Sequence, residues 1–139
     1  MSSVMESFFK DFEQNSSLGE TGALVSQFGD VFLVAGPQGV QVVPANAFAL
    51  ALPARKKQFD AMGCQSTELV SLRETLMSDH YIVVETEWQM TFTHGGKSPE
   101  KILVASTFIV YTGGGQAKIV FYLPHHDPLT ILRNRRTGV

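Results

Sequence analysis

Apolar residues near the start of the chain recur at steps of three and four, which is the spacing of one helix face. This stripe consists of Val4, Met5, Phe8, Phe9 and Phe12. Charged residues fill the opposite positions, and residues 15–19 have the composition of a helix end. The pattern predicts an amphipathic helix from about Val4 and a second helix from about Thr21. The apolar face of this second helix would carry Leu24, Val25 and Phe28.

The next stretch predicts a small hairpin and a third helix. Residues 31–34 and 40–43 are β-branched and apolar, and the Gly-Pro-Gln-Gly sequence at 36–39 is typical of a turn. The third helix is expected over about residues 45–62, with Phe48, Leu52 and Phe59 facing inward, ending at Gly63. Pro53 is expected to kink or split it.

From residue 67 the apolar period changes to two, which is typical of strands. We expect strands at about 67–77, 80–93, 102–112 and 117–123. In the second of these, one face is mainly apolar and carries Ile82, Val84, Thr86, Trp88, Met90 and Phe92. Its other face is largely polar and includes Glu85 and Glu87.

The links between these strands are too short for parallel crossovers, so the strands should form antiparallel hairpins. Helices first and strands last predict an α+β fold, with three N-terminal helices packed on a curved, mainly antiparallel sheet. We expect a single domain over residues 1–139, with its core at about 4–128 and a frayed tail at 129–139.

Composition narrows the classes of function. The 139 residues are 44% hydrophobic and only 17% charged, with a formal net charge of −2. This balance argues against general binding to nucleic acid or to an anionic membrane, both of which need a basic face. The basic clusters, at residues 55–57 and 133–136, are interpreted as solvated charge. The low charge also leaves room for a partner on part of the surface.

Cys64 is the only cysteine, so no disulfide can form within the chain. It follows Gly63 in an expected turn, with no histidine nearby in the sequence, and we interpret it as a small structural residue. The first residues lack a basic segment followed by an apolar run, so no signal peptide is expected. No run reaches the length of a membrane span. We therefore expect a cytoplasmic protein.

Several titratable residues are candidates for chemistry. Glu85 and Glu87 project from one strand face, and two adjacent carboxylates can act as acid and base if burial separates their pKa values. Because that face is the polar one, a solvated or interfacial pair is favoured. His80 and His94 stand at expected strand ends, where a pocket could recruit them.

The segment "FYLPHHDPL", residues 121–129, places two histidines and an aspartate between two prolines. The spacing of His125 and Asp127 is that of the first two ligands in a two-histidine, one-carboxylate iron site. No histidine follows residue 126, and adjacent histidines point to opposite faces of a strand. We therefore predict no metal and no cofactor. His125 and Asp127 are predicted at the rim of a pocket.

Five stretches together resemble the nuclear transport factor 2-like superfamily, which includes ketosteroid isomerase and the SnoaL-like polyketide cyclases. They are "FFKDFEQN", "FLVAGPQGV", "RKKQFDAMG", "HYIVVETEWQMTF" and "STFIVYTGGGQAKIVFY". The resemblance covers about residues 4–128 and is one of pattern, with no invariant signature. It implies a cone-shaped, cystatin-like roll around an apolar cavity, with the long helix as one wall. It also implies a homodimer through the outer sheet face.

The catalytic residues of ketosteroid isomerase do not carry over. The position of its general-base aspartate matches the stretch Val34 to Pro37, which holds no carboxylate. Its oxyanion-hole aspartic acid matches Ser106-Thr107, and its tyrosine matches a position near Phe12. The SnoaL-like cyclases also use an acid or base in the pocket, and no residue here is assigned to that role.

Three hypotheses remain. The first is a cavity that binds a small apolar or aromatic ligand, with pocket candidates Phe12, Phe28, Phe32, Trp88, Ser106, Phe108 and Tyr122. The second is an isomerase, cyclase or hydratase of the same fold. It requires at least one of His80, His94, His125, Glu85 and Glu87 inside the cavity. The third is a protein-association domain, which requires an exposed apolar patch beyond a dimer interface.

Overall fold

A computed structural model describes residues 4–136 and, for Leu18, the backbone only. The elements are α1 (Val4–Leu18), α2 (Thr21–Val25), β1 (Phe28–Gly36), β2 (Gly39–Pro44), α3 (Ala45–Ala61), β3 (Cys64–Ser78), β4 (Tyr81–Phe92), β5 (Glu100–Tyr111), β6 (Lys118–Pro124) and α4 (Pro128–Arg136). No helix in the described part of the chain combines the length and apolarity that a membrane crossing requires.

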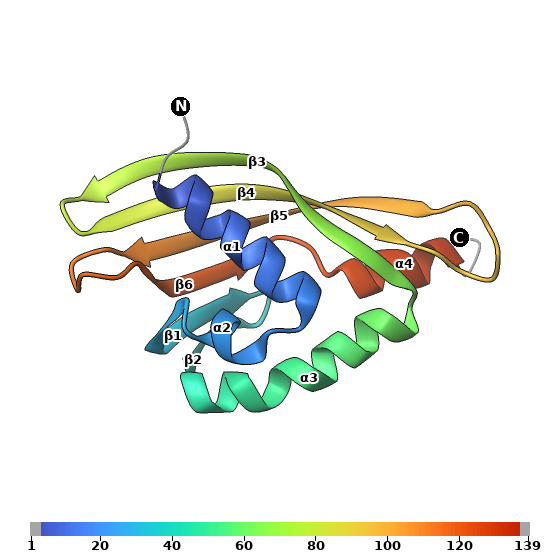
Figure 1. Cartoon of the computed structure of the whole chain (residues 1–139), viewed down its shortest axis with the longest axis horizontal. Helices are drawn as coiled ribbons and strands as arrows, with labels where there is room; N and C mark the ends of the chain where they lie inside the picture. Colours follow the sequence, from blue (N-terminus) through green and yellow to red (C-terminus); the bar gives the residue numbers. More distant parts are fainter. Residues whose placement is uncertain (1–3, 137–139) are drawn as a thin grey trace.

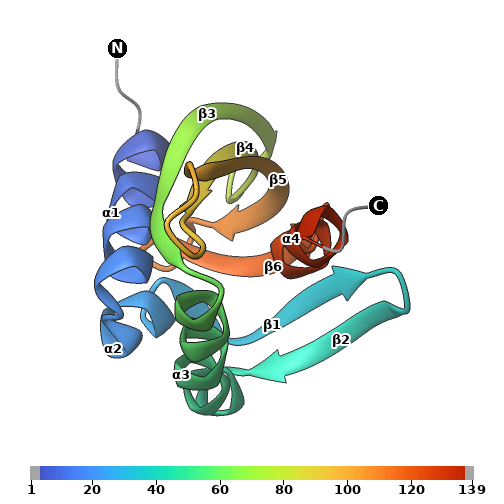
Figure 2. The same cartoon turned by 90° about the vertical axis from the view of Figure 1, so that its right-hand side faces the viewer.

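The six strands form one sheet in the order β2-β1-β6-β5-β4-β3. Every neighbouring pair is antiparallel except β1 and β6, which run parallel. Figure 1 shows α1 lying across one face of this sheet, with α3 beyond the sheet's lower edge. In the end-on view, strands β3 to β6 curl into a roll and the β1–β2 hairpin extends away from it (Figure 2). The α+β prediction, with a curved and mainly antiparallel sheet, is confirmed.

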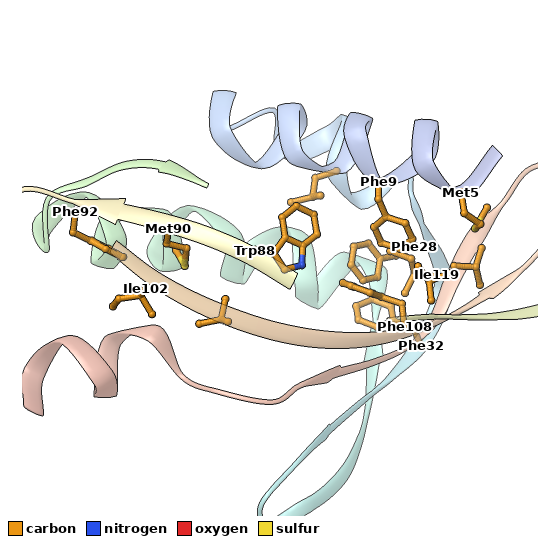
Figure 3. Close-up of a cluster of buried hydrophobic side chains, with 14 of the residues drawn as sticks. Met5, Phe9, Phe28, Phe32, Trp88, Met90, Phe92, Ile102, Phe108 and Ile119 are labelled. Atoms are coloured by element: carbon orange, nitrogen blue, oxygen red, sulfur yellow. The ribbon is translucent and has the colours of Figure 1, made fainter. Parts of the chain in front are cut away.

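Alternation along the strands separates a concave, apolar face from an outer face. On β4, Val84, Trp88 and Met90 are buried, whereas Glu87 between them is exposed. The buried aromatic residues of α1 point toward the concave face, where the ring centroids of Phe9 and Phe108 are 4.7 Å apart (Figure 3). Burying these two faces against each other removes apolar surface from water and forms the core.

Two predictions about the helices are wrong in part. The second helix ends at Val25, so Phe28 is not on its face but is the first residue of β1. The third helix runs unbroken from Ala45 to Ala61, with Pro53 inside it. A proline forfeits one hydrogen bond of the helix. Phe48 and Phe59, which pack against the core on either side of Pro53, keep both halves in one helix.

The turn after α3 requires a glycine. Gly63 has a φ of 91°, and a Cβ there would lie 1.8 Å from the backbone oxygen of Thr93. The Thr93 N–H donates to the Gly63 carbonyl at 2.9 Å, which ties the end of α3 to the end of β4. Only a residue without a side chain permits this approach.

The prediction of a frayed tail at 129–139 is wrong for the residues that the structure describes. Residues Pro128–Arg136 form α4, in which Leu129 and Leu132 are buried. Near its end, the Arg136 guanidinium donates to the Met62 carbonyl at 2.8 Å and to the Glu100 carboxylate at 2.9 Å. The core therefore extends to α4, and residues 137–139 lie outside the described part.

Candidate functional site

A cavity of about 880 Å³ lies between α3 and the concave face of the sheet. The end of α1 and the start of α4 complete its wall. Its apolar lining residues include Phe12, Leu24, Phe28, Phe48, Leu52, Phe59, Trp88, Met90, Val104 and Phe108. Volumes of about 300–1,000 Å³ are usual for pockets that hold drug-sized molecules. The cavity therefore has the size and the apolar lining of a small-molecule site.

Aromatic rings form much of the inner wall. The rings of Phe108 and Tyr122 stack, with an interplanar angle of 11° and centroids 5.0 Å apart. The Phe12 ring lies 5.6 Å from the rings of both Trp88 and Phe108. Figure 3 shows Trp88, Phe28 and Phe108 on the side of the sheet that α1 covers. A flat apolar molecule would meet ring faces and edges along this wall.

Six of the seven residues proposed for the pocket line this cavity: Phe12, Phe28, Trp88, Ser106, Phe108 and Tyr122. Phe32 does not. It is only 1% exposed, and its ring packs against Phe28 at 4.6 Å and Phe48 at 5.1 Å. Contact of the other six with a ligand stays a prediction.

Trp88 and Thr86 satisfy each other's polar groups. The indole N–H of Trp88 donates to the Thr86 hydroxyl oxygen at 2.7 Å, and this hydroxyl donates to the Ser106 carbonyl at 3.1 Å. All three residues are buried. Because the indole N–H already has an acceptor, Trp88 offers a ligand its apolar ring and no hydrogen bond.

Ser106 and Tyr122 are the hydroxyl groups of the inner wall. They lie on the neighbouring strands β5 and β6, and both line the cavity. Burial raises the pKa of the Tyr122 hydroxyl, while the Ser106 hydrogen bond and the positive charge of Arg55 oppose that rise. Tyr122 is therefore a neutral phenol at physiological pH, able to donate a hydrogen bond into the cavity.

Arg55 is exposed to solvent, as its interpretation as solvated charge implies, and it also borders the cavity. It occupies the third position of a stripe of α3 that otherwise consists of Phe48, Leu52 and Phe59. The guanidinium lies 4.6 Å from the centre of the Phe59 ring, a cation–π contact that orients it. Its nearest carboxylate is Asp127, with Nη2 and Oδ1 3.7 Å apart. The helical spacing of residues 48, 52, 55 and 59 is the feature of the sequence that predicts Arg55 on the same side of α3 as these apolar residues.

Of the two residues predicted at the pocket rim, Asp127 borders the cavity and His125 does not line it. His125 is exposed, and its Nε2 lies 2.7 Å from the Thr107 hydroxyl on the outer side of β5. His126 borders the cavity instead. The side chains of His125 and His126, which follow β6, therefore point in opposite directions, as expected for neighbouring residues of an extended chain.

Asp127 borders the cavity but serves as the N-cap of α4. Its two carboxylate oxygens accept hydrogen bonds from the Leu129 N–H at 3.1 Å and the Thr130 hydroxyl at 2.9 Å. Pro128 then occupies the first position of the helix, where the missing N–H costs nothing. The Asp-Pro pair is thus a helix start. The Asp-Pro pair could have been recognised in the sequence, where the two prolines were interpreted only as the point at which β-strand pairing stops.

The remaining candidates for catalysis lie outside the cavity. His80 and His94 are exposed in the β3–β4 turn and the β4–β5 loop. On the outer sheet face, Glu85 pairs with Arg73, and Glu87 accepts a hydrogen bond from Ser71 at 2.8 Å. With His125 also outside, none of the five side chains required by the enzyme hypothesis lines the cavity.

Cys64 borders the cavity where β3 begins. Burial raises the pKa of its thiol, with Asp60 adding to the rise and Thr67 opposing it. The thiol is therefore protonated and a poor nucleophile at neutral pH. Within residues 4–136, no three side chains of the types His, Cys, Asp and Glu gather into a possible metal site.

Comparison with known proteins places the fold. No family model matches the chain, and no curated protein matches it. Among solved structures, Aln2 from a Streptomyces species aligns over 91% of both chains, with a TM-score of 0.72 and 13% identity. An ntf2-like protein with a cystatin-like fold from Novosphingobium aromaticivorans aligns over 92% of this chain and 85% of its own, with a TM-score of 0.72 and 11% identity.

The beta subunit of the benzoate 1,2-dioxygenase from Burkholderia mallei is also similar. It aligns over 89% of this chain and 90% of its own, with a TM-score of 0.64 and 11% identity. The chain therefore has the nuclear transport factor 2-like, cystatin-like fold. Identities this low establish the fold alone, so activity must be argued from the cavity.

Proposed function

We propose that this protein binds a small molecule with a largely apolar or aromatic body in the cavity between α3 and the sheet. The observation that carries this proposal is the wall of aromatic rings around about 880 Å³ of space. The polar group of Trp88 is already satisfied within the wall. Burying an apolar ligand there would stabilise the complex without leaving a protein donor unpaired.

A binding role is favoured over catalysis because the residues that the sequence suggested for acid–base chemistry lie outside the cavity. The two histidines and two glutamates discussed for general acid–base work, His80, His94, Glu85 and Glu87, are on turns, loops and the outer face. A general base must come within hydrogen-bond reach of the proton that it removes. These side chains do not meet that condition for a molecule in the cavity.

The apolar probe 1-N-phenylnaphthylamine tests the proposal, because its fluorescence rises when it leaves water. Val104 lines the cavity and is paired with Trp88 across β4 and β5. In Val104→Phe, the added ring fills space that the probe needs, a cost of about 1–3 kcal/mol that corresponds to binding weaker by about fivefold to 150-fold. Val83→Phe makes the same change on the outer face and should leave the affinity unaltered. Absence of binding to the wild type, or equal affinity in both variants, would refute the proposal.

A homodimer through the outer sheet face is a second proposal, carried by a row of apolar residues. Val42 pairs with Leu33, Leu33 with Phe121, and Phe121 with Ile109, so the row crosses strands β2, β1, β6 and β5. Val42 and Leu33 are 68% and 38% exposed. Exposed apolar surface of this kind marks association sites.

Light scattering coupled to size-exclusion chromatography tests the association. The wild type should elute with the mass of a dimer, and Leu33→Glu should elute as a monomer, because it places a charge in the apolar row. The matched change Leu76→Glu, on the edge strand β3, should remain dimeric. A monomeric wild type would exclude the dimer, and a heteromeric complex isolated from host cells would favour the protein-association alternative instead.

We also propose that the protein resides in the cytoplasm. Its single thiol, Cys64, forms no disulfide and stays protonated through its raised pKa. Fractionation of the host cell with an antibody against the native chain tests this location, and recovery in an extracytoplasmic fraction would contradict it.

A further inference from the structure

Three polar residues occupy inward positions in otherwise apolar series. Arg55 belongs to the stripe of α3 that includes Leu52 and Phe59. Ser106 belongs to the inner face of β5, where the other members are Ile102, Val104, Phe108 and Val110. Tyr122 faces the cavity from β6, paired with Phe108. The side chains come from three elements, yet all three line the same cavity, and Ser106 and Arg55 both oppose the rise that burial causes in the pKa of the Tyr122 hydroxyl. They therefore form one polar corner within the cavity.

The polar corner retains hydrogen-bonding capacity. Arg55 makes no hydrogen bond with any residue that the structure describes, and its contacts are the Phe59 ring and the more distant Asp127 carboxylate. Both side chains of the Arg55–Asp127 pair are about half exposed, 47% and 51%, so the pair is weak. Asp127 also has both oxygens engaged in capping α4. The guanidinium therefore keeps N–H groups free for a ligand.

The charge around the cavity favours an anion. Its cationic lining residues are Arg55, Lys56 and Lys57, against the two carboxylates of Asp60 and Asp127. Lys56 is paired with Asp60 at 3.3 Å. The lining thus carries a net positive charge on a protein whose formal charge is −2. A fixed cation beside an apolar wall attracts negative charge more strongly than it would in bulk water.

We propose that the cavity binds an organic acid, whose apolar or aromatic body lies against the ring wall and whose carboxylate lies in the polar corner, paired with Arg55 and hydrogen-bonded by Tyr122. Arginine matches a carboxylate because its planar fork offers two parallel N–H donors. The phenol of Tyr122 donates a further hydrogen bond, and stacking on Phe108 orients its ring. This assignment rests on the proposed function and specifies the chemical class of its ligand.

The comparison of 2-naphthoate with 2-naphthamide isolates the carboxylate, because both probes present the same ring system to the wall. Competition against 1-N-phenylnaphthylamine measures each affinity. We expect the wild type to bind 2-naphthoate about tenfold more tightly, since a charge-assisted hydrogen bond exceeds a neutral one. The preference should vanish in Arg55→Gln, which removes the charge but keeps a hydrogen-bonding side chain. In Tyr122→Phe it should fall by about threefold to tenfold.

Arg73→Gln is the matched control, because it removes the same charge from the outer sheet face. It should keep the full preference for 2-naphthoate. Equal affinities of the wild type for the two probes would overturn the organic-acid proposal, as would an equal loss of preference in Arg73→Gln and Arg55→Gln. If 1-N-phenylnaphthylamine binds while the naphthoate preference is absent, only this inference fails. If the apolar probe does not bind at all, the proposed function itself fails.

Discussion

Replacing Thr86 by valine tests whether the inner wall satisfies its own polar groups. Threonine and valine have nearly the same volume, so the change leaves no cavity and removes only the hydroxyl. This hydroxyl accepts from the Trp88 indole N–H at 2.7 Å and donates to the Ser106 carbonyl at 3.1 Å. In Thr86→Val, the buried indole N–H loses its acceptor.

The expected cost follows from the two bonds. A buried donor left unpaired costs about 1–3 kcal/mol, and the bond to Ser106 adds a net contribution of about 1 kcal/mol. The added methyl group recovers part of this loss, roughly 1 kcal/mol or less, by apolar burial. We therefore expect the free energy of unfolding to fall by about 2 kcal/mol.

Urea denaturation followed by far-ultraviolet circular dichroism measures this change. Thr75→Val is the control, because Thr75 is exposed on the outer face and its side chain makes no hydrogen bond within the described residues. This variant should change the free energy of unfolding by no more than about 0.5 kcal/mol. Trp88 is the only tryptophan, so its emission reports the loss of the acceptor directly, as a shift to shorter wavelength. If Thr86→Val matched the wild type in stability and in emission, the account of the wall would be wrong.

Three further predictions follow from α4 and the polar corner. Leu132→Ala should lower the free energy of unfolding, measured by urea denaturation, by about 2–5 kcal/mol, because Leu132 is fully buried. A loss below about 1 kcal/mol would mean that α4 does not pack against the core. Asp127→Ala should lower the free energy of unfolding by about 1 kcal/mol in the same assay, because it removes the N-cap of α4. Asp127→Asn, which can still cap the helix, should lower it much less, and equal losses in the two variants would contradict a capping role. The raised pKa of Tyr122 makes the neutral phenol the favoured form in the folded protein, so its contribution to stability is complete below pH 10.0 and is lost as the pH rises through the folded-state pKa. Absorbance at alkaline pH should show a phenol that ionises above pH 10.0 in the wild type and is missing from Tyr122→Phe; a step that stays in Tyr122→Phe would contradict this.

The strand pattern predicted the faces of the sheet well because alternation is a local property. The position of Trp88 on the inner face of β4 follows from the period of two, whatever the rest of the fold does. The period cannot tell whether an inward residue meets empty space or another side chain. Phe28 and Phe32 both face inward on β1, yet only Phe28 borders the cavity. The difference depends on how α3 packs against β1, where Phe48 contacts both rings, and that packing is set by contacts between residues distant in the sequence.

Two structural roles were missed although the sequence carried a local signal for each. Residues 55–57 were interpreted by charge alone, although the helical period already placed Arg55 with Leu52 and Phe59. In "FYLPHHDPL", histidine and aspartate suggested a rim, whereas Asp127 followed by Pro128 is the usual start of a helix. The partner residues of α4, Met62 and Glu100, are far apart in the sequence, so the docking of that helix could not be predicted from local pattern.

The most direct test of the account is a crystal structure of the protein with 2-naphthoate. We expect the naphthalene ring against Phe12, Trp88 and Phe108, and carboxylate oxygens within about 3.2 Å of the Arg55 guanidinium and the Tyr122 hydroxyl. A naphthoate that lies outside the cavity, or with its carboxylate turned away from the polar corner, would contradict the central claim.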